Sequence, residues 1–217
     1  MIDSYKNKGQ RKKLVEEISL KGIRDARILE AIGKIPRHFF MDSTFDKMAY
    51  QDKPFPIGYG QTISQPYTVA FQTELLEVEK GDKILEIGTG SGYQAAVLLE
   101  LGAKVYTIER YHDLFLKSQK LLLQFGYRPN SYYGDGYLGK PAFSPFDKIL
   151  ITAGAPEIPV DLIKQLKING FMVAPIGKNV QTMKRIIKKS DDVFEVENYG
   201  EFVFVPMLKG KVNDSKS

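Results

Sequence analysis

A short apolar run that ends in alternating glycines constrains the fold of this chain more than any other stretch. Residues 84–87 have the pattern of a buried strand, residues 88–92 read Gly-Thr-Gly-Ser-Gly, and residues 93–99 favour a helix with an apolar face. Glycine allows a tight turn and lets a ligand lie directly against the backbone. This succession predicts the first strand, loop and helix of a nucleotide-binding α/β sheet.

The spacing of these glycines favours one class of cofactor over another. The dinucleotide fingerprint requires a glycine at position 93, where this chain has Tyr93, and the third glycine here is Gly92. An acidic residue, Glu86, lies on the strand, and the loop carries no Lys or Arg that would meet a pyrophosphate. The pattern resembles the glycine loop of S-adenosylmethionine (SAM) methyltransferases, and SAM has no phosphate group. A plain strand-to-helix turn without a ligand is the alternative.

Composition narrows the class of protein further. The chain has 217 residues, of which 43% are hydrophobic and 26% charged, values that suit one soluble globular domain. It contains no cysteine, which excludes disulfides and zinc–thiolate sites, and its histidines, His38 and His112, are too few and too far apart to predict a metal centre. No apolar stretch approaches the ~20 residues that span a bilayer, and no secretory signal is recognised, so we expect no membrane association.

The order of the expected elements indicates a doubly wound sheet. Two helices are expected within residues 10–35, and Pro36 ends the second. Strands then alternate with helices, which predicts an α/β fold with a mostly parallel sheet, N-terminal helices and an antiparallel C-terminal strand. The expected strands are 84–87, 105–108, 131–133, 148–152, 171–175, 182–187 and 202–208, and the expected core helices are 68–76, 93–99, 112–125 and 160–167.

We expect a single SAM-dependent methyltransferase domain with four parts. Residues 41–60 read as a long loop, and a long loop in a compact domain is usually functional. The four parts are an N-terminal helical lead (1–50), a substrate and active-site loop (51–66), a SAM-binding α/β core (67–208) and a basic, flexible tail (209–217).

Acidic residues follow two of the predicted strands, at the edge where such sheets bind their ligands. Glu109 lies 109 − 88 = 21 positions after the first glycine of the loop, a distance at which a carboxylate accepts hydrogen bonds from ribose hydroxyls. Asp135 would receive the adenine amino group, while Gly136 keeps a slot open for the ring. Each alone also suits a solvated strand end or an ordinary turn. Beside the glycine loop, the cofactor interpretation is favoured.

The segment 49–66 resembles the signature of the protein-L-isoaspartate O-methyltransferases. It reads Ala-Tyr-Gln-Asp-Lys-Pro-Phe-Pro-Ile-Gly-Tyr-Gly-Gln-Thr-Ile-Ser-Gln-Pro, and its Gly-Gln-Thr-Ile-Ser part is specific to that family. The resemblance covers roughly residues 14–208 and includes the runs 85–96, 105–110, 134–136, 145–147, 151–156 and 204–206. It implies a Rossmann-like fold and a cytoplasmic, monomeric repair enzyme that uses SAM to methylate the free carboxylate of L-isoaspartyl residues in damaged proteins and peptides. No metal, membrane or nucleic acid is expected.

The same resemblance implies roles for individual residues. Ser64 takes the catalytic position, and Gln61, Thr62 and Ile63 belong to a segment that covers the SAM methyl group. The substrate-binding residues are Ile57, Gly60, Thr62, Ser64 and Tyr67. The cofactor-binding residues are Gln61, Thr62, Ile63, Glu86, Gly88, Thr89, Gly90, Ser91, Gly92, Glu109, Arg110, Asp135, Gly136 and Thr152.

Carboxyl methylation also agrees with the scarcity of histidine. A carboxylate of pKa ~4 is ionised at neutral pH, so it attacks a methyl sulfonium without a general base. The alignment of the methyl donor with the acceptor supplies the rate enhancement. Ser64 would orient the carboxylate rather than activate it. The alternative role for Ser64 is the N-cap of the following helix. Tyr67, Lys140 and Gly154 depart from the family pattern, which bears on substrate fit and rate more than on the reaction.

Other interpretations stay open at this point. Much of the net charge of +5 comes from residues 6–13 and 184–189, which suit a nucleic-acid surface or, as we favour, solvated faces. A SAM methyltransferase of RNA or of a small molecule is one alternative, although no additional base or Asn/Asp-Pro-Pro-aromatic motif is found. A non-catalytic SAM-binding protein is another, and the intact glycine loop together with segment 60–64 argues against it.

Overall fold

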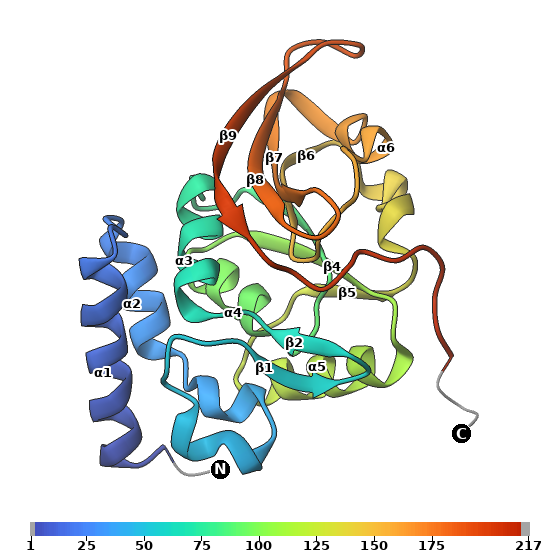
Figure 1. Cartoon of the computed structure of the whole chain (residues 1–217). Coiled ribbons are helices and arrows are strands. Elements are labelled where there is room, and N and C mark those ends of the chain that lie inside the picture. The colour runs from blue at the N-terminus through green and yellow to red at the C-terminus, as the bar shows by residue number, and fades with distance from the viewer. Residues whose placement is uncertain (1–2, 214–217) are drawn as a thin grey trace.

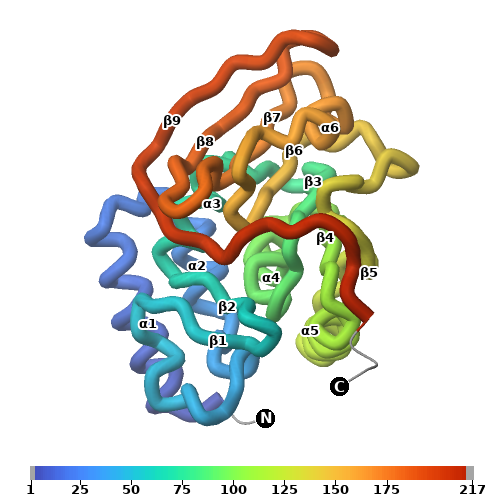
Figure 2. The backbone as a smooth tube through the Cα atoms, turned by 45° about the vertical axis from the view of Figure 1, so that its right-hand side comes forward, coloured from blue at the N-terminus to red at the C-terminus, as the bar shows by residue number. Residues whose placement is uncertain are grey.

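The computed structural model of the chain describes residues 3–213 and is built around a seven-stranded sheet. The strand order is β5-β4-β3-β6-β7-β8-β9, and the pairs from β5 to β7 are parallel, whereas β8 and β9 are antiparallel (Figures 1 and 2). The predicted doubly wound α/β class is therefore confirmed. The strands of this sheet are β3 (Lys83–Ile87), β4 (Lys104–Glu109), β5 (Asn130–Tyr133), β6 (Phe146–Ile151), β7 (Leu166–Ile176), β8 (Gln181–Lys188) and β9 (Phe194–Phe202).

Helices cover both faces of the sheet, as the alternation of strand and helix along the chain requires. The second of them, α2, follows the N-cap Asp25, whose side chain accepts a hydrogen bond from the Arg27 backbone N–H. The helices are α1 (Tyr5–Leu20), α2 (Ala26–Lys34), α3 (Pro66–Leu75), α4 (Tyr93–Glu100), α5 (His112–Gln124) and α6 (Val160–Ile163), with the 3₁₀ turns η1 (Arg37–Phe40), η2 (Ser43–Met48), η3 (Gly136–Leu138) and η4 (Pro141–Phe143).

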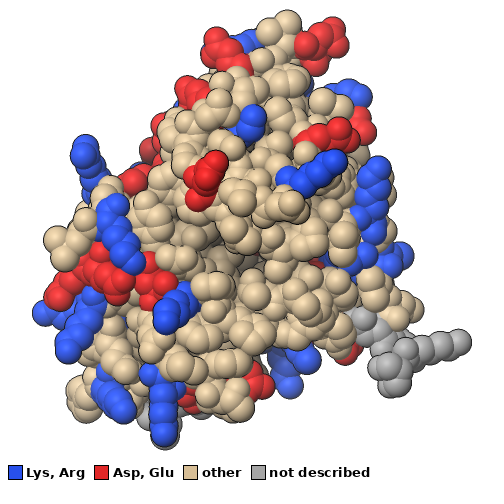
Figure 3. Space-filling model, in the orientation of Figure 1, with Lys and Arg blue, Asp and Glu red and all other residues tan. Residues whose placement is uncertain are grey.

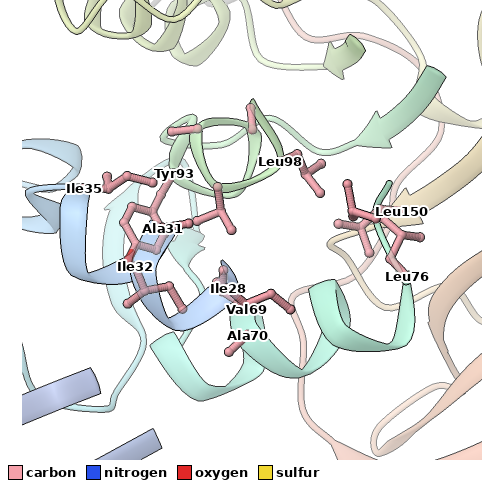
Figure 4. Close-up of a cluster of buried hydrophobic side chains, with 14 of the residues drawn as sticks. Ile28, Ala31, Ile32, Ile35, Val69, Ala70, Leu76, Tyr93, Leu98 and Leu150 are labelled. Carbon is pink, nitrogen blue, oxygen red and sulfur yellow. The ribbon is translucent and has the colours of Figure 1, made fainter. Parts of the chain in front are cut away.

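Neighbouring residues of the central strand β3 belong to different apolar clusters because they face opposite sides of the sheet. Ile84 packs in a cluster with α2, α3 and α4, and Leu85 and Ile87 pack in a second cluster that includes α6. Figure 4 shows part of the first cluster, in which α2 and α3 bring apolar side chains toward Tyr93 of α4 and Leu150 of β6. Burial on both faces holds β3, and with it the start of the glycine loop, in a fixed position.

Residues 55–63, expected within or beside a loop, form a separate antiparallel hairpin of β1 (Phe55–Gly58) and β2 (Gln61–Ile63). Phe55 pairs with Ile63, and both side chains are buried against the core. The two strands are very short, and prolines and glycines lie in or next to them. An alternation of apolar and polar residues long enough to predict a strand is therefore absent here. The hairpin places residues 57–64 over the carboxyl edge of the main sheet (Figure 1).

The expectation of a strand over 202–208 was wrong. Among the described residues the last strand is β9, which ends at Phe202. Most of its residues are exposed, and apolar and polar residues alternate only over 194–197. The more apolar residues 203–208 instead cross the carboxyl edge of the sheet, where Gly154 and Pro206 form an isolated bridge. The helix expected over 160–167 is also shorter, because α6 ends at Ile163 and β7 begins at Leu166.

The segment expected as a flexible tail is hydrogen-bonded over its first residues. The Arg110 guanidinium donates to the carbonyl oxygens of Lys209 and Gly210, each at 3.1 Å, and the backbone N–H of Val212 donates to the Arg110 carbonyl at 2.8 Å. Residues 214–217 of the predicted tail lie outside the described residues. Within the part that is described, none of the helices has the length and apolar character needed to cross a membrane.

Candidate active site

The glycine loop lies between the end of β3 and the start of α4 and takes backbone conformations that favour glycine. Gly88, Gly90 and Gly92 have φ angles of 95°, 54° and 87°. A Cβ on Gly88 would lie 2.6 Å from the Oγ1 of Thr152, whose hydroxyl lies 2.7 Å from the Gly88 carbonyl oxygen and 2.9 Å from that of Ile87. The end of β6 is thereby joined to the loop, which leaves the loop little freedom.

Glu109 ends β4 directly beside the glycine loop. Its carboxylate accepts hydrogen bonds from the backbone N–H groups of Gly90 at 2.8 Å and Tyr111 at 2.9 Å. Burial raises the pKa of the Glu109 carboxyl, and these backbone donors act in the opposite direction. A fixed carboxylate in a cavity can accept two hydroxyl groups at once, as the sequence interpretation requires of a ribose partner.

Glu86 lies beneath the loop rather than in contact with the cavities described below. Its carboxyl is fully buried and accepts a hydrogen bond at 2.6 Å from the Thr107 hydroxyl, which in turn contacts the hydroxyl of Thr89 at 2.6 Å. Burial raises the pKa of Glu86 to about 8, so this carboxyl is mainly protonated at neutral pH. Glu86 is not among the residues that line the cavities, and its hydrogen bonds connect it through Thr107 to the loop residue Thr89; its role in cofactor binding stays a prediction.

In the loop after β5, the backbone of Gly136 lies close to the side chain of Ile87, as we expect of a slot for an adenine ring. A Cβ on Gly136 would lie only 2.4 Å from the Cγ2 of Ile87, so no larger residue fits without a shift of the core. The neighbouring Asp135 carboxylate accepts the backbone N–H groups of Tyr137 at 2.9 Å and Gly210 at 2.6 Å. Gly136 lines the cavity, whereas Asp135 is not among its lining residues and is held by the C-terminal segment through Gly210.

Two adjoining cavities, which share Thr62, Gly88, Gly90 and Thr152, bring most predicted site residues together at the carboxyl edge. The first is lined by Gln61, Thr62, Ile87, Gly88, Gly90, Ile108, Glu109, Arg110, Gly136, Thr152, Ala153, Val205, Pro206, Met207 and Leu208. The second is lined by Thr62, Ile63, Ser64, Val69, Gly88, Thr89, Gly90, Ser91, Tyr93, Gln94 and Thr152.

Ser64 is available for a role at the second cavity. The N-cap of α3 is Gln65, without a side-chain cap, so the alternative that Ser64 caps this helix was wrong. The Asp52 carboxylate instead accepts the Tyr67 backbone N–H at 2.7 Å. Within residues 3–213 no hydrogen bond is found for the Ser64 hydroxyl, which leaves it open to an acceptor group.

Other predicted residues lie around these cavities rather than in them. Ile57 faces a larger third hollow of about 820 Å³ beside α5, Gly60 belongs to the hairpin turn, and Gly92 is the N-cap of α4. The Tyr67 ring stacks on Phe71 with centroids 5.8 Å apart. Of the other departures, Lys140 has its ammonium 4.0 Å from the Tyr132 ring centroid, whereas Gly154 is bridged to Pro206, which lines the first cavity.

The residues missed by the sequence interpretation come mainly from the C-terminal segment that covers the first cavity. Val205, Pro206, Met207 and Leu208 all line it, and so do the strand-end residues Ile108 and Ala153. The runs 151–156 and 204–206 resemble the family and were the available signal. A strand assignment over 202–208 hid their role, because a strand in the sheet would not have crossed its edge.

Three features together define the class of SAM-dependent methyltransferases. The central strand of the parallel sheet ends in a glycine loop, the next strand carries a buried acid, and a covered cavity lies between them. The residues present fit SAM, because the slot at Gly136 and the carboxylate of Glu109 suit a nucleoside, and the loop 88–92 itself contains no Lys or Arg.

Comparison with known proteins narrows this class. The chain matches the family model for protein-L-isoaspartate(D-aspartate) O-methyltransferase over residues 9–212. It is 57% identical to the protein-L-isoaspartate O-methyltransferase of Christiangramia forsetii and 58% identical to that of Flavobacterium psychrophilum, in both cases over 97% of this chain and 100% of the relative. A solved protein-L-isoaspartate O-methyltransferase superposes with a TM-score of 0.82 at 30% identity, over 90% of this chain and 65% of that one. A Plasmodium falciparum protein of this type, in complex with S-adenosyl-L-homocysteine, has a TM-score of 0.80 at 24% identity over 92% of this chain and 99% of that one, which supports the fold.

The chain belongs to the protein-L-isoaspartate(D-aspartate) O-methyltransferase family. The predicted enzyme class, the cofactor SAM and the transfer of a methyl group to isoaspartyl carboxylates are thereby confirmed. The roles of individual residues stay predictions.

Proposed function

We propose that the β1–β2 hairpin and the glycine loop of this chain align an isoaspartyl carboxylate with the methyl group of SAM, and that Ser64 orients that carboxylate. The observation that supports this most is that Ser64 and Thr62 line the same cavity as Gly88 and Ser91. A hydroxyl without a partner at this place can donate to a carboxylate oxygen.

The cofactor residues have separate tasks in this proposal. Glu109 accepts the ribose hydroxyls, Gly136 leaves room for the adenine ring, and Asp135 accepts the adenine amino group. The glycine loop contacts the methionyl part, and Thr152 holds that loop in place through the two carbonyl groups it contacts. The proposal thus assigns the ribose, the adenine and the methionyl part of SAM each to at least one described residue.

The chemistry needs little besides alignment. SAM, when bound, supplies a methyl group on a positively charged sulfur. The acceptor carboxylate is already ionised at neutral pH, so the site needs no base, and in-line positioning supplies roughly 7–11 kcal/mol of the barrier reduction. Ser64 holds one carboxylate oxygen by a hydrogen bond, while the covering segment 205–208 excludes water from the cofactor.

The same proposal includes a cytoplasmic, monomeric enzyme that acts on damaged proteins and peptides without nucleic acid. The basic clusters support it because several of their members pair with acids, such as Arg185 with Glu77 at 2.5 Å, Lys188 with Asp191 at 3.1 Å and Arg11 with Asp3 at 2.9 Å. On the face shown in Figure 3, Lys and Arg side chains are interspersed with Asp and Glu around the rim, and uncharged residues occupy the middle.

Paired peptides that differ only in isoaspartate or aspartate test the acceptor. An isoaspartyl residue carries its carboxylate one atom off the main chain, whereas an aspartyl carboxylate sits farther out and misses the methyl group. Because a misplacement of about 1 Å can cost ~100-fold in rate, we expect strong preference for the isoaspartyl peptide. The readout is base-labile methyl ester formed from labelled SAM. Equal methylation of both peptides, or base-stable methyl on added RNA alone, would contradict the proposal.

Substitution of Ser64 by alanine tests its role as an orienting group. We expect turnover to fall about tenfold, with S-adenosylhomocysteine affinity and thermal stability nearly unchanged, because the hydroxyl has no partner within the described residues and caps no helix. Initial rates, calorimetry and thermal melts measure the three quantities. The matched control is Ser144→Ala, which removes an exposed hydroxyl distant from the cavities. Normal turnover of the Ser64 variant would remove this residue from the mechanism.

A further inference from the structure

Tyr59 is held at the tip of the β1–β2 hairpin in a backbone conformation that is unusual for a residue with a side chain. Its φ angle is 55°, and it stands between Gly58 and Gly60. A bulky residue in this left-handed region is strained and persists where its surroundings compensate. The compensating contacts of Tyr59 therefore carry information about its role.

Those contacts reach across to the start of α5. The Tyr59 hydroxyl donates a hydrogen bond of 2.5 Å to the Oδ2 of Asp113, 54 positions away in the sequence. The Tyr59 ring stacks on the ring of Tyr111, with centroids 5.4 Å apart and an angle of 26° between the planes. A charge-assisted hydrogen bond and an aromatic stack together fix the hairpin tip on this segment.

The segment that receives the tip is itself part of the cofactor site. The Tyr111 backbone N–H donates to the Glu109 carboxylate at 2.9 Å, and the Arg110 guanidinium lies over the Tyr111 ring at 4.9 Å from its centroid. The stack on Tyr111 thus connects the hairpin to the acid that we assign to the ribose.

Between its base and its tip the hairpin passes over the first cavity. Gln61 and Thr62 line this cavity from the hairpin, and Glu109 and Arg110 line it from the opposite side. Close to the tip, the Cδ1 of Ile57 would lie 3.4 Å from a Cβ on Gly90, so the hairpin rests directly on the glycine loop. Figure 2 shows β1 and β2 in front of α4 and beside α5.

We propose that Tyr59 is a positioning residue that latches the hairpin across the cofactor groove onto Tyr111 and Asp113. The latch holds Thr62 and Ser64 in register with the bound cofactor and must open for the cofactor to leave. The proposal rests on the proposed function for the placement of Ser64, but its main readout, release of S-adenosylhomocysteine, involves no acceptor.

The test compares Tyr59→Phe, which keeps the ring stack, with Tyr59→Ala, which loses both contacts. We expect the dissociation rate of labelled S-adenosylhomocysteine to rise about tenfold in Tyr59→Phe and further in Tyr59→Ala. We also expect the KM for SAM to rise and kcat to fall, while the thermal midpoint stays nearly unchanged because the side chain is exposed. Tyr199→Phe is the matched control, since Tyr199 donates to Glu197 at 2.8 Å on β9, and it should leave the dissociation rate unchanged.

A double-mutant cycle with Asp113→Ala separates a latch from two independent contacts. If Tyr59 and Asp113 act together through this hydrogen bond, Tyr59→Phe combined with Asp113→Ala should raise the dissociation rate no more than either change alone. Unchanged release in both Tyr59 variants, or fully additive effects in the cycle, would overturn the proposal. Failure of the wild-type protein to methylate an isoaspartyl peptide would instead count against the proposed function and leave the release measurement interpretable.

Discussion

Replacement of Gly88 by alanine is expected to reduce the affinity for S-adenosylhomocysteine about 100-fold. The φ angle of 95° is strained for a residue with a Cβ, at a cost of roughly 1–2 kcal/mol. The new methyl group would also lie 2.6 Å from the Thr152 hydroxyl, which must move and lose its contacts to the carbonyl groups of Ile87 and Gly88. Both cavities change shape, because Thr152 and Gly88 line both.

Gly81 provides a matched control for the backbone strain. Its φ angle is 92°, close to that of Gly88, but a Cβ there would meet nothing within 4 Å. Gly81→Ala should therefore lose similar stability and keep its affinity for the cofactor product. Calorimetric titration and urea denaturation of the two variants measure both quantities. Equal loss of affinity in both variants would show that strain alone, and not the contact with Thr152, decides binding.

Glu86→Gln is expected to remove a large part of the pH dependence of stability. The ordinary pKa of this carboxyl is 4.5 and burial raises it to about 8 in the folded protein. Below pH 4.5 both states hold the proton. Between pH 4.5 and 8 the unfolded chain releases it while the folded protein keeps it, so the free energy of unfolding falls as the pH rises. The loss amounts to about 3–5 kcal/mol and is complete above pH 8.

Urea denaturation at pH 5 and pH 8.5 measures this difference. Glutamine imitates the protonated carboxyl and still accepts the hydrogen bond from Thr107, so Glu86→Gln should be more stable than the wild-type protein at pH 8.5 by several kcal/mol. At pH 5 the two proteins should differ much less. Glu201→Gln, which neutralises an exposed carboxylate on β9, controls for the loss of one charge. Parallel pH profiles for wild-type and Glu86→Gln proteins would contradict the assignment.

Most core elements of the sheet were predicted correctly because their signals are local. The runs of β3, β4 and β6 are mostly apolar, interrupted by Glu86 in β3 and Thr107 in β4, as is typical of strands buried on both faces, and helices of recognisable length separate them. Parallel strands place their carboxyl ends at one edge, so the sequence predicts that the glycine loop, Glu109 and Gly136 meet. They line one cavity in the structure.

The elements that were misread lack such local signals. The strands β1 and β2 have four and three residues and contain a proline and a glycine, which is too short and too irregular for an alternation to appear. The strand β9 is mostly exposed, and its apolar–polar alternation over 194–197 is too short to predict a strand of nine residues. Residues 205–208 are apolar and line a cavity, and apolar character alone does not distinguish such a covering segment from a strand.

The class of fold, the kind of cofactor and the residues at the strand ends could be predicted from the sequence alone, because each of these follows from residue types within a few positions of one another. The burial that raises the pKa of Glu86 to about 8, the N-cap position of Gln65 in place of Ser64, and the contact of Tyr59 with Asp113 became known only from the folded chain. Burial, hydrogen-bond partners and contacts between segments more than fifty positions apart depend on how the whole chain packs. No residue type or spacing in the printed sequence encodes them locally.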